Sequence, residues 1–346
     1  KKFLSIALAL LMVCVMLPVV ALAAEKTALT YEELESAIST ANDGDTIKLL
    51  ADIDLSQTIT VNKTITLNMN GKKLYNTSDL WDKPTAEAGN WSLISVRGSG
   101  NLTITGNGTF AAKENDCYAV DVQESATVTI KNGTFIGNIH AVYVFAGTAN
   151  VEGGTYSVQQ KYPDSAKGDE FVLNCYDANR ANGTARINVT GGTFKNFNPA
   201  DNKAEGEGNN FADNSLVVQK NNTVQNNDYY VGNAANEVIA AASKGEEIFV
   251  LNGTTLTNVP AGVIIQNRTG DRITVNGKDV ELTGDAGYTV PASNITIIVP
   301  GDTTPAETPK TEDQKNPSTG ANDFVGLAAA AAVVALLGSA VVLRKK

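Results

Sequence analysis

One four-residue phrase recurs four times in the middle of this chain and constrains its fold more than any other feature. Asn-Gly or Gly-Gly, then Thr and an aromatic residue, occupy positions 107–110, 132–135, 153–156 and 191–194. Alternating apolar residues precede the four copies: Leu102 and Ile104, Val128 and Ile130, Ala149 and Val151, and Ile187 and Val189. A period of two indicates strands, and repeats of about 20–25 residues are typical of solenoids. An all-β solenoid with about three short strands per coil is therefore expected.

A further alternating run lies one strand earlier in each repeat. Its members, expected to point into the core, are Leu93 and Ser95, Val120 and Val122, Val142 and Val144, and Leu173 and Cys175. Cys117 would lie two coils before Cys175, which separates them by about 10 Å. A disulfide needs Cα atoms within about 7 Å, so we expect two free thiols.

These repeats resemble the right-handed parallel β-helix of pectate-lyase-like proteins, found among bacterial surface and phage proteins. The resemblance implies such a β-helix, with an N-terminal cap, over residues 24–217. The cap is predicted from the residues themselves. Thr30 and Glu33 form a capping box before a short apolar helix face that ends at Gly44. A helix there would cover the open end of the solenoid and block edge-to-edge aggregation.

Residues 33–75 and 237–281 share a fainter pattern: a helix, a glycine, an apolar strand and a closing Asn-Gly-Lys. The second copy predicts that 218–299 forms a small β-rich C-terminal module, and an irregular continuation of the solenoid is the alternative. Residues 300–315 are rich in Pro, Thr, Glu, Asp and Lys, which predicts a disordered linker.

Both ends of the chain indicate export. Residues 1–23 combine two lysines, an apolar stretch and a small-residue cleavage site, as in a secretory signal peptide. At the other end, residues 316–346 contain a short motif, an apolar run (327–343) of about the minimum length that spans a bilayer, and a basic tail. The motif residues are Asn316, Pro317, Ser318, Thr319 and Gly320.

This tail resembles the LPxTG-like sorting signal of Gram-positive cell-wall proteins, with Asn316 where Leu is commonest. The resemblance implies that a sortase cleaves the Thr319–Gly320 bond and joins the chain to peptidoglycan. It thus implies an extracellular, wall-attached protein with a membrane-inserted precursor. The class of sortase stays open, and an uncleaved single-pass anchor is the alternative.

The composition limits the chemistry. A formal net charge of −10 argues against a nucleic-acid partner. The single histidine, His140, excludes a His-rich metal centre and is interpreted as a corner residue between two strands. No cofactor or metal site is predicted. Calcium is suggested only by the resemblance, because the lyases of that family use an acidic calcium cluster and an arginine.

Three insertions, 76–90, 157–170 and 195–213, follow the Thr-aromatic strands and should lie along one edge. Aromatic residues expected near that edge are Trp81, Trp91, Tyr75, Tyr162 and Tyr176. Their rings could stack on sugars or shield the core beneath long loops. We interpret them as candidate glycan-binding residues.

A catalytic constellation is not evident from the sequence. The arginines are Arg97, Arg180 and Arg186, and the acids, which are scattered, are Asp121, Glu124, Asp169, Glu170 and Asp177. The sequence therefore favours a non-enzymatic, adhesin-like surface protein that binds glycans or host proteins. The alternatives are a wall-anchored lyase or hydrolase of uronate-containing polysaccharide, and a structural spacer.

Overall fold

The computed structural model describes residues 23–80, 92–114, 117–160, 171–201, 210–223 and 226–292. Nearly all of the predicted signal peptide, the whole linker and the whole sorting signal lie outside these ranges. Among the described residues, the structure contains no helix with the length and apolar character needed to cross a membrane.

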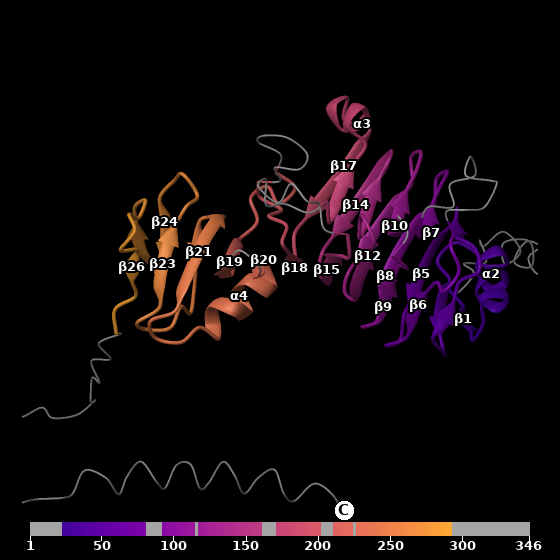
Figure 1. Cartoon of the computed structure of the whole chain (residues 1–346), viewed down its shortest axis with the longest axis horizontal. Helices are drawn as coiled ribbons and strands as arrows, with labels where there is room; N and C mark the ends of the chain where they lie inside the picture. The colour runs from indigo at the N-terminus through magenta and orange to yellow at the C-terminus, as the bar shows by residue number, and fades with distance from the viewer. Residues whose placement is uncertain are drawn as a thin grey trace, which may run out of the picture. The chain divides into compact units, whose positions relative to one another are not determined.

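Three sheets run along the N-terminal part of the molecule (Figure 1). The seven-stranded sheet comprises β1 (Glu25–Ala28), β2 (Thr46–Leu49), β5 (Thr64–Asn68), β8 (Asn101–Thr105), β11 (Thr127–Ile130), β14 (Gly147–Val151) and β17 (Ala185–Val189). The five-stranded sheet comprises β4 (Ile59–Val61), β7 (Ser92–Val96), β10 (Tyr118–Val122), β13 (Val142–Val144) and β16 (Leu173–Cys175). The third sheet begins with β3 (Ile53–Asp54), β6 (Lys73–Tyr75), β9 (Thr109–Ala111), β12 (Thr134–Gly137), β15 (Thr155–Val158) and β18 (Gly192–Lys195).

Each strand of these coils pairs in parallel with the equivalent strand of the next coil, which confirms the predicted parallel β-helix. A right-handed sense is the rule for parallel crossovers. The Thr-aromatic phrases stack in register as Phe110, Phe135, Tyr156 and Phe194. The centroids of neighbouring rings lie 4.8–5.1 Å apart, and the ring planes are nearly parallel, with interplanar angles of 10–12°. This ladder forms one wall of a core that no single coil could bury alone.

The predicted inward rows are confirmed except in β7. Ile94 and Val96, not Leu93 and Ser95, pair with Val120 and Val122. All five residues of β7 are buried, so both of its faces are covered. Alternation identifies the inward face only where the other face is exposed, and β7 therefore gave no usable signal.

Neither of the two cysteines in the described chain forms a disulfide, and both are buried, as predicted. Cys175 aligns with Val144, and Val144 with Val122, so the thiol continues an inward apolar row. Burial raises the pKa of Cys117 to about 12, which keeps that thiol protonated and unreactive.

The predicted cap is helix α2 (Tyr31–Ser39). The Thr30 hydroxyl accepts a hydrogen bond from the Glu33 amide at 3.3 Å, as in a capping box. The Glu33 carboxylate accepts from the Leu29 amide at 2.7 Å, one residue earlier than in the standard box. Leu34 and Ile38 are buried against the first coil, so the helix covers the start of the core.

Beyond β18 the third sheet continues with antiparallel pairs through β20 (Asn226–Val231), β19 (Val217–Thr223) and β21 (Glu247–Asn252). It ends with β23 (Ile264–Asn267) and β26 (Tyr288–Thr289). A small sheet of β22 (Thr255–Leu256), β24 (Ile273–Val275) and β25 (Lys278–Val280) lies in the same region. With helix α4 (Asn233–Ala240), these strands enclose a second apolar core. The region thus has its own core and shares a sheet with the solenoid.

The fainter repetition has a structural counterpart after each helix. The Asp45 carboxylate accepts a hydrogen bond from the Asn42 amide at 2.9 Å, and the Glu246 carboxylate accepts one from the Ser243 amide at 2.8 Å. In both copies the acidic residue is followed by a strand that pairs in parallel with a later strand. The helix-turn-strand unit that opens the solenoid is therefore used again to open the second core.

Candidate functional site

Four side chains form a row that we call the corner stripe: Arg97, Gln123, Phe145 and Tyr176. Each follows the last residue of a strand in the five-stranded sheet. The amides of Gln123, Phe145 and Tyr176 each donate to the carbonyl of the preceding coil at 2.9 Å. The residue just before each of them is buried in the core, so the corner stripe lies on the outer side, where Phe145 and Tyr176 are exposed and Arg97 and Gln123 are half-buried. It presents one side chain per coil, spaced about 4.8 Å apart along the solenoid.

The aromatic pair of the corner stripe is exposed. Phe145 and Tyr176 retain 40% and 45% of their accessible surface, although large apolar side chains are usually buried. Their ring centroids lie 4.9 Å apart with an interplanar angle of 26°, so they are stacked. The Asn179 side chain donates to the Phe145 carbonyl at 2.7 Å and fixes the corner. Together the rings offer a flat apolar surface to solvent.

Polar groups continue the corner stripe on the earlier coils. Arg97 Nε donates to the Ser95 hydroxyl at 2.9 Å, and this hydroxyl donates to the Asp121 carboxylate at 3.0 Å. Gln123 Nε2 donates to both oxygens of Asp121, at 2.8 and 3.0 Å. Asp121 is 1% exposed, and burial raises the pKa of its carboxyl to about 6. The network fixes Gln123 and Arg97 in place.

His140 lies at a corner between β12 and β13, as predicted. Its ring contacts Tyr118 and Tyr143, and its two nitrogens face the Phe171 carbonyl and the Asn174 amide at 2.7 and 3.2 Å. Burial lowers the pKa of His140 to about 4, so the imidazole is neutral at physiological pH. Within the described ranges no three His, Cys, Asp or Glu side chains gather as metal ligands would.

The structure places only part of the predicted aromatic set. Tyr176 belongs to the corner stripe. Tyr75 lies in β6 of the third sheet, with Lys73 Nζ 4.6 Å from its ring centroid, so the two tyrosines occupy different corners. Trp81, Trp91 and Tyr162 lie outside the described residues.

The described strands that flank the predicted insertions place these insertions at one corner of the solenoid, after the third sheet. The first two, 76–90 and 157–170, each connect a strand of the third sheet to one of the five-stranded sheet. The third, 195–213, also follows a strand of the third sheet.

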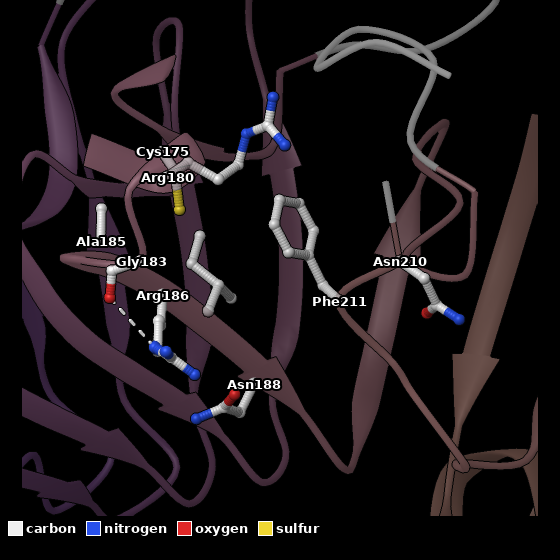
Figure 2. Close-up of a pocket in the computed structure, with 9 residues that line it drawn as sticks. Cys175, Arg180, Gly183, Ala185, Arg186, Asn188, Asn210 and Phe211 are labelled. Atoms are coloured by element: carbon white, nitrogen blue, oxygen red, sulfur yellow. Dashed lines mark hydrogen bonds between the residues drawn. The ribbon is translucent and has the colours of Figure 1, made fainter. Parts of the chain in front are cut away.

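Of the arginines and acids considered from sequence, the fold brings together Arg97 and Asp121. Asp177 and Arg180 share the single turn of helix α3 (Asp177–Ala181). Arg186 lies on β17 (Figure 2), and Glu124 is exposed at a corner with a φ of 62°. The predicted positions Asp169 and Glu170 fall outside the described ranges.

Phe145 was not recognised from the sequence. The feature that could have identified it is its position. Val144 pairs with Cys175, so Phe145 and Tyr176, which follow them, occupy equivalent places in neighbouring coils.

Comparison of the chain with protein-family models, curated proteins and solved structures finds no match. Strand order and register alone therefore identify the parallel β-helix.

Proposed function

We propose that this chain is a surface-displayed, non-enzymatic carbohydrate-binding protein whose ligand lies along the corner stripe. The observation that carries the proposal is the exposed, stacked pair Phe145 and Tyr176. Flat aromatic faces pack against the C–H faces of sugar rings. Such rings also bury much area at little cost in conformational entropy, since each has only two rotatable side-chain bonds.

The arrangement suits an extended ligand. The corner stripe follows the solenoid axis, so successive units of an oligosaccharide would meet successive coils. Gln123 and Arg97 supply hydrogen-bond donors and acceptors beyond the aromatic pair, and their contacts to Asp121 and Ser95 hold them in place. A few fixed polar groups beside an apolar face are typical of sites that select an orientation of the ligand.

A glycan array tests the proposal. The full chain, with and without calcium, should bind a subset of host or wall glycans and release no product. Replacing Phe145 and Tyr176 by Ala should weaken binding roughly tenfold or more. Leu50→Ala is the matched control, because Leu50 is equally exposed (40%) on another part of the solenoid. Binding that survives the double substitution would refute the assignment to the corner stripe.

The part of the proposal that concerns display on the cell surface is supported by the sequence of the sorting signal. We propose that a sortase cleaves between Thr319 and Gly320 and that peptidoglycan becomes attached to Thr319, in the wall of a Gram-positive bacterium. Mass spectrometry of wall fragments released by a muralytic enzyme should show a peptide that ends at Thr319 and carries wall material. A peptide that continues into Gly320 would identify an uncleaved membrane anchor instead.

A polysaccharide lyase or hydrolase is the second candidate, favoured by Asp121 alone. A carboxyl with a pKa raised to about 6 can donate a proton near neutral pH. Asp121 is almost fully buried, however, and a glycosidase needs a second carboxyl across the sugar. Product that disappears in Asp121→Asn would favour this candidate over simple binding.

A further inference from the structure

The carboxylate of Asp45 binds the backbone nitrogen of Ala24 at the start of the solenoid. Asp45 directly precedes β2 and Ala24 directly precedes β1, strands that lie side by side under α2 (Figure 1). Asp45 Oδ1 accepts a hydrogen bond from the Ala24 N–H at 2.8 Å, and Oδ2 accepts one from the Asn42 N–H at 2.9 Å. Asp45 retains only 2% of its accessible surface, so this carboxylate is buried.

The charge of Asp45 has no cation in direct contact among the described residues. Both donors to its carboxylate are neutral amides. Two lysines lie nearby, but Lys26 Nζ donates to the Thr40 carbonyl at 2.9 Å and Lys63 Nζ to the Ala41 carbonyl at 2.7 Å. The two amide hydrogen bonds, and to a smaller extent these lysines, lower the pKa of Asp45, so the group is ionised at neutral pH. A buried carboxylate is destabilising unless a cation pairs with it.

The second helix-turn-strand unit shows what pairs with the acid at this position. Glu246 follows α4 as Asp45 follows α2, and its carboxylate accepts from the Ser243 amide at 2.8 Å. It also accepts from the ammonium group of Lys220 at 3.2 Å. Lys220 comes from β19, which pairs with β21 as β1 pairs with β2. The first unit therefore has the nitrogen of Ala24 where the second unit has an ammonium group.

Ala24 is also the residue that would begin the mature chain if the signal peptide is cleaved after Ala23, as the sequence predicts. Hydrolysis breaks the C–N bond between Ala23 and Ala24. The oxygen of water becomes part of the Ala23 carboxylate, and the nitrogen of Ala24 becomes an ammonium group. Both residues are exposed, and the Ala24 carbonyl accepts from the Thr46 amide at 2.8 Å, which keeps the new terminus beside Asp45. A separation of 2.8 Å suits an ammonium–carboxylate hydrogen bond.

We propose that Asp45 is the binding site for the α-ammonium group of the mature chain, so that removal of the signal peptide supplies the cation that the first coil lacks. The proposal is independent of carbohydrate binding. It implies that the start of the solenoid becomes more stable once the chain is cleaved. The contribution of the bound ammonium should be complete below the pKa of a free terminus, about 7.7–8.0, and lost as pH rises through the higher pKa of the bound group.

Two forms of the chain from Ala24 to Lys346 test the site, one with a free α-amine and one with that amine acetylated. The pH dependence of amine labelling, followed by mass spectrometry, gives the pKa of the free α-amine. It should lie at least about one unit above that of a free terminus, which makes labelling at pH 7 roughly tenfold slower. The free form should also unfold at a higher temperature than the acetylated form at pH 7. This difference should disappear as pH rises past the pKa of the bound amine.

Variants assign the effect to one carboxylate. Asp45→Asn should return the amine to an ordinary pKa and abolish the difference between the free and acetylated forms. Asp43→Asn is the matched control, because Asp43 lies in the same turn but its carboxylate accepts from the Thr64 amide at 3.0 Å. It should retain both effects. Acetylation changes no side chain, so the comparison of the two native forms holds even if Asp45→Asn weakens the fold.

Three results would overturn the proposal. The first is an ordinary α-amine pKa in the native chain, and the second is an equally raised pKa in Asp45→Asn. The third is an exported protein whose first residue, read by mass spectrometry of its N-terminal peptide, is not Ala24. None of these results bears on the corner stripe, so this proposal and the carbohydrate-binding function can fail separately.

Discussion

At the scale of single residues, Asp121 and His140 make opposite contributions to the pH dependence of stability. The folded state raises the pKa of Asp121 to about 6 by burial, against about 3.9 in a free peptide. Its contribution is complete below about pH 4 and is lost as pH rises through 6. Burial lowers the pKa of His140 to about 4, from about 6.5. Its contribution is complete above about pH 6.5 and is lost as pH falls through 4.

The two effects should largely cancel in the native protein and separate in variants. In Asp121→Asn, the free energy of unfolding should rise with pH between 4 and 6.5, because the contribution of His140 is no longer opposed by that of Asp121. In His140→Gln it should fall over the same range. Each full change is on the order of 3 kcal/mol, from about two pKa units. Urea unfolding at four pH values measures it, and parallel curves for both variants would contradict the burial of these groups.

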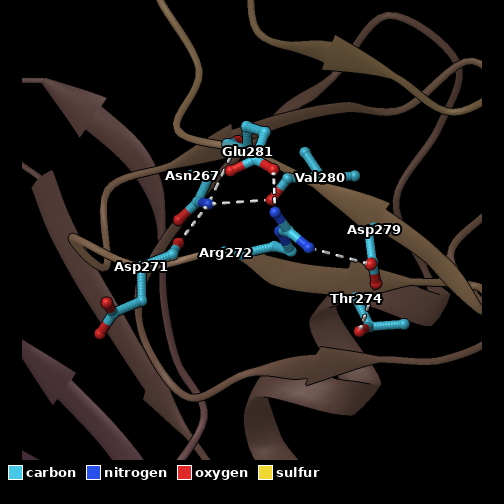
Figure 3. Close-up of polar contacts among 7 residues, drawn as sticks. All are labelled: Asn267, Asp271, Arg272, Thr274, Asp279, Val280 and Glu281. Atoms are coloured by element: carbon cyan, nitrogen blue, oxygen red, sulfur yellow. Dashed lines mark hydrogen bonds and ion pairs between the residues drawn. The ribbon is translucent and has the colours of Figure 1, made fainter.

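Asn267 and Arg272 provide a second contrast between residues, in the C-terminal region (Figure 3). The buried Asn267 amide donates to the carbonyls of Asp271, Glu281 and Val280 at 2.8, 3.3 and 3.4 Å. Arg272 instead forms ion pairs with Asp279 and Glu281, in which all the side chains are exposed. The amide therefore holds the loop internally, and the ion pairs lie at its surface.

Asn267→Ala should destabilise the fold by on the order of 3 kcal/mol, because buried acceptors lose their donor. Asn267→Asp should cost more, since it turns a carboxylate oxygen toward the same carbonyls. Arg272→Ala should cost less than about 1 kcal/mol, as expected for exposed ion pairs. Denaturant midpoints of the three variants give the order, and an Arg272→Ala effect equal to that of Asn267→Ala would refute it.

At the scale of elements, the two helices that open the two cores begin differently. Thr30 caps α2 through its side chain, so Thr30→Ala should cost about 1 kcal/mol. Gly232 caps α4 with a φ of 59° and no side-chain hydrogen bond, and a Cβ there would lie 2.2 Å from the Thr190 carbonyl. Gly232→Ser, which supplies a preferred capping residue, should therefore destabilise the protein more than Thr30→Ala. Thermal unfolding compares them, and a stabilising Gly232→Ser would contradict this geometry.

The elements also show which signals the sequence carries. The Thr-aromatic ladder and the rows through Leu102 and Val128 were predictable, because these strands bury one face and alternate. The register of β7 was not, since both of its faces are buried. The corner stripe was half predictable. Tyr176 is conspicuous in the sequence, but Phe145 gains meaning only when coils of unequal length are aligned, and pairing of the strands determines that alignment.

At the scale of the whole molecule, the described chain has two apolar cores joined by one sheet. The sequence predicted a β-rich C-terminal region but not that β20 would pair with β18. The last strand of the third sheet's parallel series, β18, has a free edge, and the repeat pattern of the sequence does not indicate which strand pairs with it. The antiparallel strand β20 covers that edge.

This organisation predicts how the molecule unfolds. Coils of a solenoid interact mainly with their neighbours, so damage should spread along the stack and weaken with distance. Ile248 belongs to the second core, and Ile248→Ala should therefore increase hydrogen exchange in α4 and β21 while β5 to β14 keep their protection. Phe135→Ala, in the middle of the ladder, should expose the coils on both sides of β12. Hydrogen–deuterium exchange with mass spectrometry measures both variants. Uniform loss of protection in Ile248→Ala would mean that the shared sheet couples the two cores into one cooperative unit.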